Sequence, residues 1–381
     1  MTAPRVARPR VVFAGRARYR LPLVPAQRAK WDAVSNELDP IVLASSGGGA
    51  GGDSRFRLLR SFGSNAIDGP LFYTTLPVRI AVELRRSPSP VAIVCQSPYE
   101  TAAALLARAV VRAPAAVIAE VHGDWRTATR LYGSSFRRLA ARPADALAVW
   151  ALRRADGVRT LSGFTSELVR AVGVEPDATF PTWTDLDAFV RLGVVPLPVE
   201  PRAVFIGVLQ PYKNIEGVVA TWRRVLDRVP AAVLHVVGDG PQAVLVERLR
   251  AECPANVEWS PALSAPDVAA ALDRAQLLFL PSRREGLGRV VIEALARARP
   301  VVAANAGGIP DLVQSGVNGE LFDPDDHLGM ANALAGLFED RERLEALAAA
   351  ARPSVEEWLW TPGDYADRLR NLVDVVVTKR R

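Results

Sequence analysis

Short runs of Val, Ile and Ala alternate with helix-like stretches along the whole chain. These runs lack strict alternation of apolar and polar residues, which is typical of parallel strands covered by helices on both faces. We therefore expect an α/β fold with parallel sheets. The expected strands are residues 11–15, 41–45, 91–97, 115–121, 158–162, 203–209, 233–238, 257–260, 277–281 and 300–304, and the clearest helices of the first half are residues 99–112, 144–155 and 163–172.

The pattern is interrupted once, by the segment RLGVVPLPVEPR at residues 191–202, which holds three prolines and has the character of a linker. A chain of 381 residues is long enough for two domains. We expect an N-terminal domain at 1–190, a linker at 191–202 and a C-terminal domain at 203–354. Residues 355–381 should form a helix that packs back toward the N-terminal domain. Each domain resembles a doubly wound sheet, whose ligands bind beyond the carboxyl ends of the strands.

Composition describes a folded protein, because 49% of the residues are hydrophobic and 23% are charged. No apolar run approaches the roughly 20 residues that cross a bilayer. The N-terminus MTAPRVARPR leads directly into a strand-like run, without the apolar core of a secretory signal. Cys95 and Cys253 lie too far apart to suggest a disulfide framework or a metal site. These features favour a cytoplasmic location.

Positive charge gathers in the first half of the chain. Residues 1–60 hold 11 Lys and Arg against 4 Asp and Glu, and residues 126–154 hold seven Arg against one Asp. Such patches fit a phosphorylated substrate or an anionic lipid surface, or they are only a solvated Arg-rich surface. Only three of the 47 basic residues are lysines, namely Lys30, Lys213 and Lys379. A lysine in the interior is therefore less expected to serve only as surface charge.

Candidate chemistry concentrates in residues 282–313, SRREGLGRVVIEALARARPVVAANAGGIPDLV. Gly286 and Gly288 stand where a helix is expected to begin, and the free N–H groups of a helix start favour phosphate. Glu285 precedes this start and Glu293 lies more than a turn inside the helix. A ligand with central phosphates and hydroxyl-bearing rings at both ends fits this order. Alternatively, Arg289, Glu293 and Arg297 fall at i, i+4 and i+8 and could form a solvated salt-bridge stripe.

Three further segments stand at the carboxyl ends of expected strands. Lys213 lies in FIGVLQPYKNIEG at residues 205–217, and Gly238 and Gly240 lie in HVVGDGP at residues 235–241. The third segment is the Gly307–Gly308 turn. Each segment alone is consistent with a structural turn. Together they favour a shared ligand site.

The second half resembles the nucleotide-binding domain of the family 4 retaining glycosyltransferases, which have the GT-B fold. That family has a Ser-x-x-Glu-Gly-Phe-Gly loop, a second Glu eight positions later, then Ala-x-Gly-x-Pro-Val-Val and a Gly-Gly turn. This chain has Ser282, Glu285, Gly286, Leu287, Gly288, Glu293, Pro300, Val301, Val302, Gly307 and Gly308 in register. AEVHGDW at 119–125, RRADGVRTLS at 153–162 and TDLDAFV at 184–190 resemble the family more weakly.

The resemblance implies two Rossmann-like doubly wound domains facing a central cleft, with the acceptor bound by the N-terminal domain and a sugar nucleotide by the C-terminal one. It implies that Glu285 holds hydroxyls of the donor sugar, and that Glu293 takes the ribose diol. Lys213 would neutralise the diphosphate as the glycosidic bond breaks. The amides of Leu287 and Gly288 would join Lys213 at the phosphates, and Gly286 is a further substrate-binding candidate. Gly238 and Gly240 would line the base and ribose. His122 would reach from the first domain toward the sugar, and Gly15 is a further candidate in that domain.

The chain departs from the family at two important places and at one minor one. The position after the glycine of residues 205–209 is normally Arg, a phosphate partner, and here it is Val208. Another cation could substitute for it, with Arg289, Arg16 or Arg18 as candidates. After Gly15 the family has small residues, whereas this chain has RARYR. The smaller change of a family glycine to Ala298 carries less weight.

The expected activity is transfer of a sugar, with retention, from a nucleotide-sugar to a hydroxyl of a sugar, a lipid-linked or a small-molecule acceptor, as in polysaccharide, glycolipid or glycoconjugate biosynthesis. The resemblance implies no metal, no cofactor and no nucleic-acid partner, whereas the basic patches suit peripheral contact with an anionic membrane at its inner face. Two alternatives stay open. One is a GT-B epimerase or pseudo-glycosyltransferase, and the other is a degenerate GT-B binding protein without catalysis.

Overall fold

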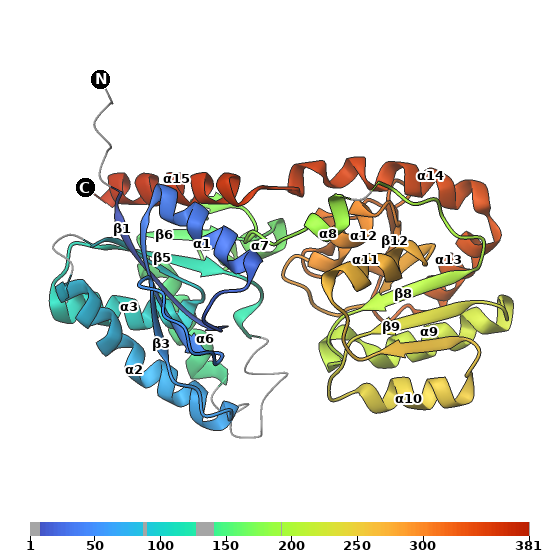
Figure 1. The fold of residues 1–381 in the computed structure, drawn as a ribbon, viewed down its shortest axis with the longest axis horizontal. Helices are drawn as coiled ribbons and strands as arrows, with labels where there is room; N and C mark the ends of the chain where they lie inside the picture. The colour runs from blue at the N-terminus through green and yellow to red at the C-terminus, as the bar shows by residue number, and fades with distance from the viewer. Residues whose placement is uncertain (1–7, 87–89, 127–140, 192, 381) are drawn as a thin grey trace. The chain divides into compact units, whose positions relative to one another are not determined.

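The computed structural model describes residues 8–86, 90–126, 141–191 and 193–380. The chain divides into two compact units, one made of residues 1–184 and 360–381 and the other of residues 185–359. Each unit is an α/β layer structure built on a parallel sheet (Figure 1). The predicted α/β fold with two doubly wound units is therefore confirmed.

The first unit has, within its described residues, a seven-stranded sheet in the order β3-β2-β1-β4-β5-β6-β7. Its strands are β1 (Arg10–Tyr19), β2 (Asp39–Ser46), β3 (Phe56–Leu59), β4 (Pro90–Cys95), β5 (Ala116–Val121), β6 (Gly157–Thr160) and β7 (Ala178–Thr179). Its helices are α1 (Pro25–Glu37), α2 (Asn65–Arg86), α3 (Pro98–Val111), α6 (Ala141–Arg154), α7 (Gly163–Arg170) and α15 (Pro362–Arg380).

Alternate residues of β1 face opposite sides of this sheet and nucleate two cores. Val11 and Phe13 pack in one cluster together with residues of α1 and α15. Val12 and Ala14 pack in the other cluster together with residues of α2 and α3. Helix α15, the last of the chain, therefore completes the core of the first unit, and it lies beside α1 on the same side of the sheet (Figure 1).

The second unit has a six-stranded parallel sheet in the order β10-β9-β8-β11-β12-β13, again among the described residues. Its strands are β8 (Arg202–Ile206), β9 (Val233–Val237), β10 (Val257–Ser260), β11 (Leu277–Leu280), β12 (Val301–Ala304) and β13 (Gly319–Phe322). Its α-helices are α8 (Asp187–Val190), α9 (Ile215–Arg228), α10 (Ala243–Glu252), α11 (Ala265–Asp273), α12 (Arg289–Ala296), α13 (His327–Glu339) and α14 (Arg341–Ala351). Short 3₁₀ turns lie at η1 (Pro211–Lys213), η2 (Ile309–Asp311) and η3 (Pro353–Trp358).

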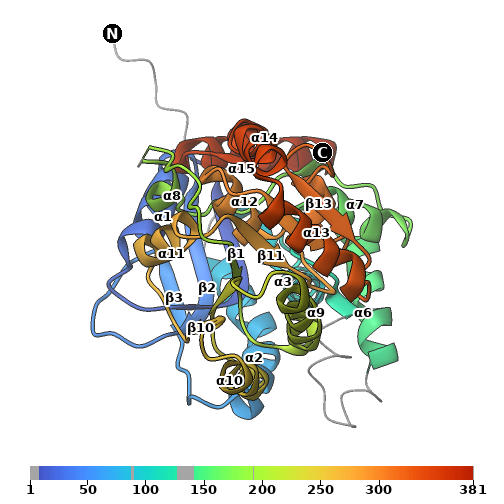
Figure 2. The same ribbon diagram turned by 90° about the vertical axis from the view of Figure 1, so that its right-hand side faces the viewer.

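Helices cover both faces of the second sheet. Helix α9 packs against α13, with the rings of Trp222 and Phe338 6.4 Å apart, and α10 lies beside α9 (Figure 2). Helix α12 packs instead with α11, α14 and η3. The carboxyl ends of the strands lead into connecting loops, and these loops carry the candidate site residues predicted from the sequence.

The segment predicted to be a linker is held by side chains of the second unit. Arg299 donates to the carbonyl of Val195 at 3.0 Å, and Arg341 donates to the carbonyls of Leu197 and Pro198 at 3.0 and 2.7 Å. Gln276 adds a bond of 3.0 Å to the carbonyl of Pro198. The second unit begins at Asp185, before the expected domain end at 190, because the buried Phe189 of α8 packs in its core and its carbonyl accepts from Arg297 at 3.3 Å.

Candidate functional site

The loops that follow four strands of the second unit are hydrogen-bonded in a row. The amide of Leu209, after β8, donates to the carbonyl of Asp239, after β9, at 2.9 Å. The amide of Arg283, after β11, donates to Tyr212 at 2.8 Å, and the amide of Gly308, after β12, donates to Glu285 at 3.2 Å. The four segments predicted from the sequence to share a ligand are therefore neighbours at one edge of the sheet.

Lys213 and Glu285 form an ion pair at the centre of this row. Lys213 Nζ lies 2.5 Å from Glu285 Oε1, and only 10% and 11% of the two side chains are exposed. Gly207 leaves room for the lysine stem, because a Cβ at Gly207 would lie 3.2 Å from Lys213 Cε. The ammonium also lies 5.6 Å from the ring centroid of Tyr212. The site thus presents a nearly buried cation whose partner is a carboxylate of the adjacent loop.

Asn214 fixes the position of Lys213, and the sequence reasoning did not single it out. Its backbone is left-handed, with φ of 58°, and its side chain caps α9 by accepting from the amide of Gly217. The side-chain amide donates to the carbonyls of Pro281 and Pro324 at 3.1 and 2.8 Å. Asn is tolerant of this conformation and is a preferred N-cap residue, so the Lys-Asn pair before a helix was the signal available in the sequence.

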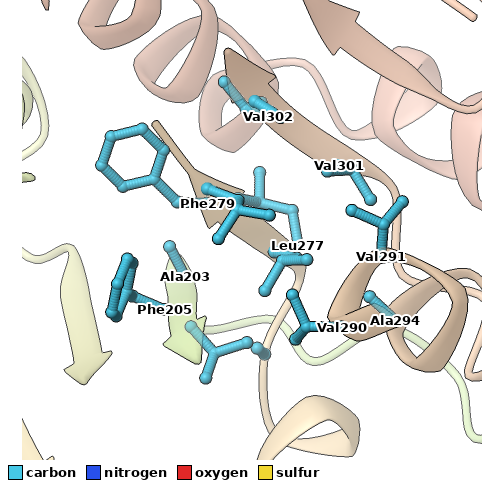
Figure 3. Close-up of a cluster of buried hydrophobic side chains, with 14 of the residues drawn as sticks. Ala203, Phe205, Leu277, Phe279, Val290, Val291, Ala294, Val301 and Val302 are labelled. Carbon is cyan, nitrogen blue, oxygen red and sulfur yellow. The ribbon is translucent and has the colours of Figure 1, made fainter. Parts of the chain in front are cut away.

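Helix α12 begins where the glycines predict. Gly288 is its N-cap residue with φ of 91°, a conformation that disfavours other residues, and the helix starts at Arg289. Val290, Val291 and Ala294 pack on the side of Leu277 and Val301 of the sheet (Figure 3). This packing fixes the direction of the helix start, whose partial positive charge favours an anion.

Glu293 lies in the second turn of α12 and is held by Arg289. Arg289 Nε lies 2.7 Å from Glu293 Oε1, and the arginine is 56% exposed whereas the carboxylate is buried. Burial raises the pKa of Glu293, although Arg289 partly opposes the shift. The pair is therefore a buried acid covered by an accessible cation.

The alternative of a solvated Arg289–Glu293–Arg297 stripe is wrong, because Arg297 is fully buried. Arg297 donates through Nε and Nη2 to the two carboxylate oxygens of Asp273, each at 2.8 Å. It also donates to the carbonyls of Phe189 and Gly193 at 3.3 and 3.1 Å. A bidentate pair of this kind is strong and directional. Arg297 thus serves the interior of the second unit and not its surface.

The candidate glycines make room for neighbouring backbone. Gly238 has φ of 137°, and a Cβ there would lie 1.9 Å from the carbonyl oxygen of Gly207. Gly307 has φ of 61°, and a Cβ there would lie 2.0 Å from the carbonyl oxygen of Glu285. The spare space at these positions is filled by the adjacent loops. Gly238 and Gly307 therefore bring the Lys213 and Glu285 loops together, whatever they contribute to a ligand.

The predicted Gly240, Gly286 and Leu287 lie in loops of the second unit, whereas His122, Gly15, Arg16 and Arg18 lie in the first unit. His122 directly follows β5, and Gly15 lies inside β1, where a Cβ would collide with the side chain of Gln96. Arg18, one candidate for the missing family arginine, pairs at 3.0 Å with the buried Asp68. Arg18 is therefore committed to a carboxylate of its own unit.

Within the described residues no group of three or more His, Cys, Asp or Glu side chains is arranged to hold a metal ion. No helix of that same part of the chain combines the length and the apolar character needed to cross a membrane. Residues 127–140, which hold three of the seven arginines of the second basic patch, lie outside the described residues.

Residues 197–353 match the family described as "Glycosyl transferases group 1". The chain is 32% identical over 191 residues to the sulfoquinovosyl transferase SQD2 of Arabidopsis thaliana, which covers 49% of this chain and 36% of that protein. It is 35% identical over 173 residues to a D-inositol 3-phosphate glycosyltransferase of Rhodococcus opacus, which covers 43% and 39% of the two chains. The chain thus aligns with well under half the length of these two relatives.

Two solved structures resemble nearly the whole chain. Sucrose-phosphate synthase from Thermosynechococcus elongatus matches with a TM-score of 0.74 at 19% identity, over 97% of this chain and all of the other. The lipopolysaccharide outer core galactosyltransferase WaaB matches with a TM-score of 0.70 at 16% identity, over 96% and 99%. The chain therefore has the GT-B fold, made of two Rossmann-like units.

Proposed function

We propose that this chain is a retaining, metal-independent glycosyltransferase of family 4, which moves a sugar from a nucleotide-sugar donor to a hydroxyl acceptor. The observation that carries the proposal is the Lys213–Glu285 pair beside the start of α12. All three features lie inside the stretch that matches the glycosyltransferase family, residues 197–353. A cation and a helix start together suit a diphosphate, and a carboxylate beside them suits sugar hydroxyls.

The donor diphosphate replaces Glu285 as the partner of the Lys213 ammonium. In the structure the charge of Lys213 is balanced by Glu285. When the diphosphate takes the ammonium, the carboxylate is released to accept hydrogen bonds from hydroxyls of the sugar. Lys213 then stabilises the negative charge that grows on the diphosphate while the bond to the sugar breaks. The amides of Gly286, Leu287 and Gly288 assist at the phosphates, and no protein nucleophile is assigned.

Glu293 and Arg289 form the nucleoside side of the proposed site. The Glu293 carboxylate accepts from the ribose hydroxyls, and Gly238 and Gly240 line the base and the ribose. Arg289 is the replacement that we propose for the arginine missing at Val208. It is exposed, it stands at the first position of α12, and its carboxylate partner Glu293 is the proposed ribose ligand. His122 and Gly15 are assigned to contacts that the first unit makes with the substrates.

The acceptor is a sugar, a lipid-linked molecule or a small molecule, and we propose that the protein works at the cytoplasmic face of an anionic membrane. Helix α2 exposes Ile67, Val78 and Val82, and its last turn carries Arg85 and Arg86. Exposed apolar side chains beside arginines suit a lipid surface. Liposome flotation tests this part. Binding to neutral and anionic vesicles alike, or to neither, would contradict an electrostatic membrane contact.

A thermal-unfolding screen with UDP, GDP, ADP and TDP, without added metal and with EDTA, tests the donor site. A nucleotide at 100 times its Kd stabilises the native protein by about 2.7 kcal/mol. This corresponds to a rise of roughly 5–11 °C for a unit of 150–250 residues. One nucleotide should produce the shift, and Lys213→Ala should reduce it to about half or less. If none of the four shifts the wild-type protein, the chain is a degenerate binding protein, and release of free epimerised sugar would indicate the epimerase alternative.

A further inference from the structure

A buried carboxylate holds the imidazole of His122 at the end of β5. Glu120 Oε2 lies 3.1 Å from His122 Nε2, and the glutamate is buried whereas 36% of the histidine side chain is exposed. His122 directly follows the last residue of β5, and the carboxyl ends of parallel strands are where such units bind their ligands. His122 therefore stands at the edge of the sheet where a ligand of the first unit would bind, with part of its ring exposed.

Glu120 is itself fixed from the opposite side. It stands opposite Arg159 in the register of β5 and β6, and Arg159 Nη2 lies 3.0 Å from Glu120 Oε1. The guanidinium of Arg159 is fully buried and lies 4.5 Å from the ring centroid of Phe180 and 5.7 Å from that of Tyr365. One carboxylate oxygen is thus committed to Arg159 and the other to His122.

The charge of Glu120 is permanent at neutral pH. Burial alone would raise its pKa, but the opposing effects of Arg159, His122 and Lys30 outweigh burial and bring the pKa of Glu120 to about 2. Lys30 of α1 contributes from above the ring of Tyr365, 5.0 Å from its centroid. An ionised carboxylate can only accept hydrogen bonds, so the hydrogen of the Glu120–His122 bond belongs to Nε2.

We propose that Glu120 is a positioning residue, which fixes His122 as the tautomer with its hydrogen on Nε2 and leaves Nδ1 as an acceptor for a substrate hydroxyl. A neutral imidazole has one donor nitrogen and one acceptor nitrogen, so the bond to Glu120 determines which kind faces the ligand. That the hydroxyl belongs to a sugar rests on the proposed function. The tautomer itself rests only on the contacts of Glu120.

Nitrogen-15 NMR of protein labelled on histidine tests the tautomer without any substrate. At pH 8 the His122 signals should show the hydrogen on Nε2, and His122→Asn identifies them among those of the three histidines. In Glu120→Gln the side-chain amide can donate to Nε2, so the hydrogen should move to Nδ1 in a substantial fraction of molecules. A wild-type ring with its hydrogen on Nδ1 would overturn the proposal.

A double-mutant cycle tests whether Glu120 acts through His122. Glu120→Gln should lower kcat about ten-fold, the effect of losing one well-placed hydrogen bond, and leave KM for the donor unchanged. In the His122→Asn background the same substitution should change kcat less than two-fold, because residues acting as a unit are not additive. Equal losses in both backgrounds, or a loss of thermal stability with kcat unchanged, would contradict the positioning role.

Asp156→Asn is the matched control. Asp156 also joins a charged pair inside the first unit, with Arg108, and it accepts from the amide of Val117 at 2.7 Å. The control should lower the unfolding temperature while kcat and the His122 signals stay as in the wild type. If the wild-type protein transfers no sugar from any donor, the proposed function fails, and the NMR result still tests the tautomer on its own.

Discussion

Neutralising Glu285 should strengthen the binding of a nucleoside diphosphate while removing sugar transfer. Lys213 Nζ lies 2.5 Å from Glu285 Oε1, and both side chains are almost buried. A diphosphate has to draw the ammonium away from this carboxylate and lie close to its negative charge. Glu285→Gln removes the competitor and the repulsion, but it also removes the acceptor that we assign to the donor sugar.

The magnitude follows from the bond that is exchanged. A hydrogen bond to a charged group contributes about 1.5–3 kcal/mol, and 1.4 kcal/mol corresponds to a ten-fold change in Kd. Lys213→Ala should therefore raise the Kd of the nucleoside diphosphate roughly 10–150-fold. Glu285→Gln should lower the Kd of the nucleoside diphosphate by up to about ten-fold. In the wild type, breaking the Lys213–Glu285 bond offsets part of the free energy gained from the bond between Lys213 and the diphosphate.

Isothermal titration calorimetry measures both values with the nucleotide that gives the largest thermal shift. Glu339→Gln is the control, because Glu339 pairs with Arg228 on exposed α-helices of the same unit, about half of each side chain being exposed. Its Kd should equal that of the wild type. If Glu285→Gln weakens binding as much as Lys213→Ala does, the carboxylate is a direct or structural support for the nucleotide, and the exchange of partners is refuted.

Three further predictions concern arginines and a buried acid. Arg297→Leu leaves Asp273 without its bidentate partner and should destabilise the second unit by about 3–5 kcal/mol, which is a fall of roughly 6–20 °C in Tm. The control Arg228→Leu removes an exposed pair and should cost less than about 1 kcal/mol. Similar Tm values for the two variants would contradict the buried network. Arg289→Ala should weaken donor binding roughly ten-fold in calorimetry, and an unchanged Kd excludes Arg289 as the replacement for the missing arginine. Glu120 has a pKa of about 2 in the folded protein against an ordinary 4.5, so it contributes about 3 kcal/mol above pH 4.5, which is lost as the pH falls toward 2. Acid unfolding of Glu120→Gln should therefore show a shallower loss of stability over that interval, and an unchanged slope would contradict the assignment.

The apolar runs of the sequence predict the central strands of both sheets, because central parallel strands are buried on both faces and have few polar residues. The edge strands β3, β7 and β13 have no such run and were not predicted. Helix α2 was also missed, because Pro70 and Pro77 suggest a break. Phe72, Leu76, Ile80 and Leu84 are all buried at a spacing of four residues, and this packing sustains the helix across both prolines.

The glycine and strand pattern also predicts that Lys213 and Glu285 share one edge of the sheet, but it cannot show that they pair. Pairing depends on how far two loops approach each other, which the left-handed Gly238 and Gly307 and the buried Asn214 determine. The burial of Arg297 depends on its pairing with Asp273, which is distant in sequence, so it could not be predicted from the sequence pattern either. The scarcity of lysine was an unused signal for Lys30, which lies beside Glu120 and Tyr365.

We propose that the second unit binds a nucleotide-sugar whose sugar is transferred to an acceptor. The most direct measurement is release of nucleoside diphosphate from a panel of nucleotide-sugars in the presence of sugar and lipid-linked acceptors, followed by NMR of the product. We predict release with one donor, a glycoside that retains the anomeric configuration of that donor, and no product from folded Lys213→Ala or Glu285→Gln protein. Undiminished transfer by both variants would contradict the site, and an inverted product would contradict the mechanism.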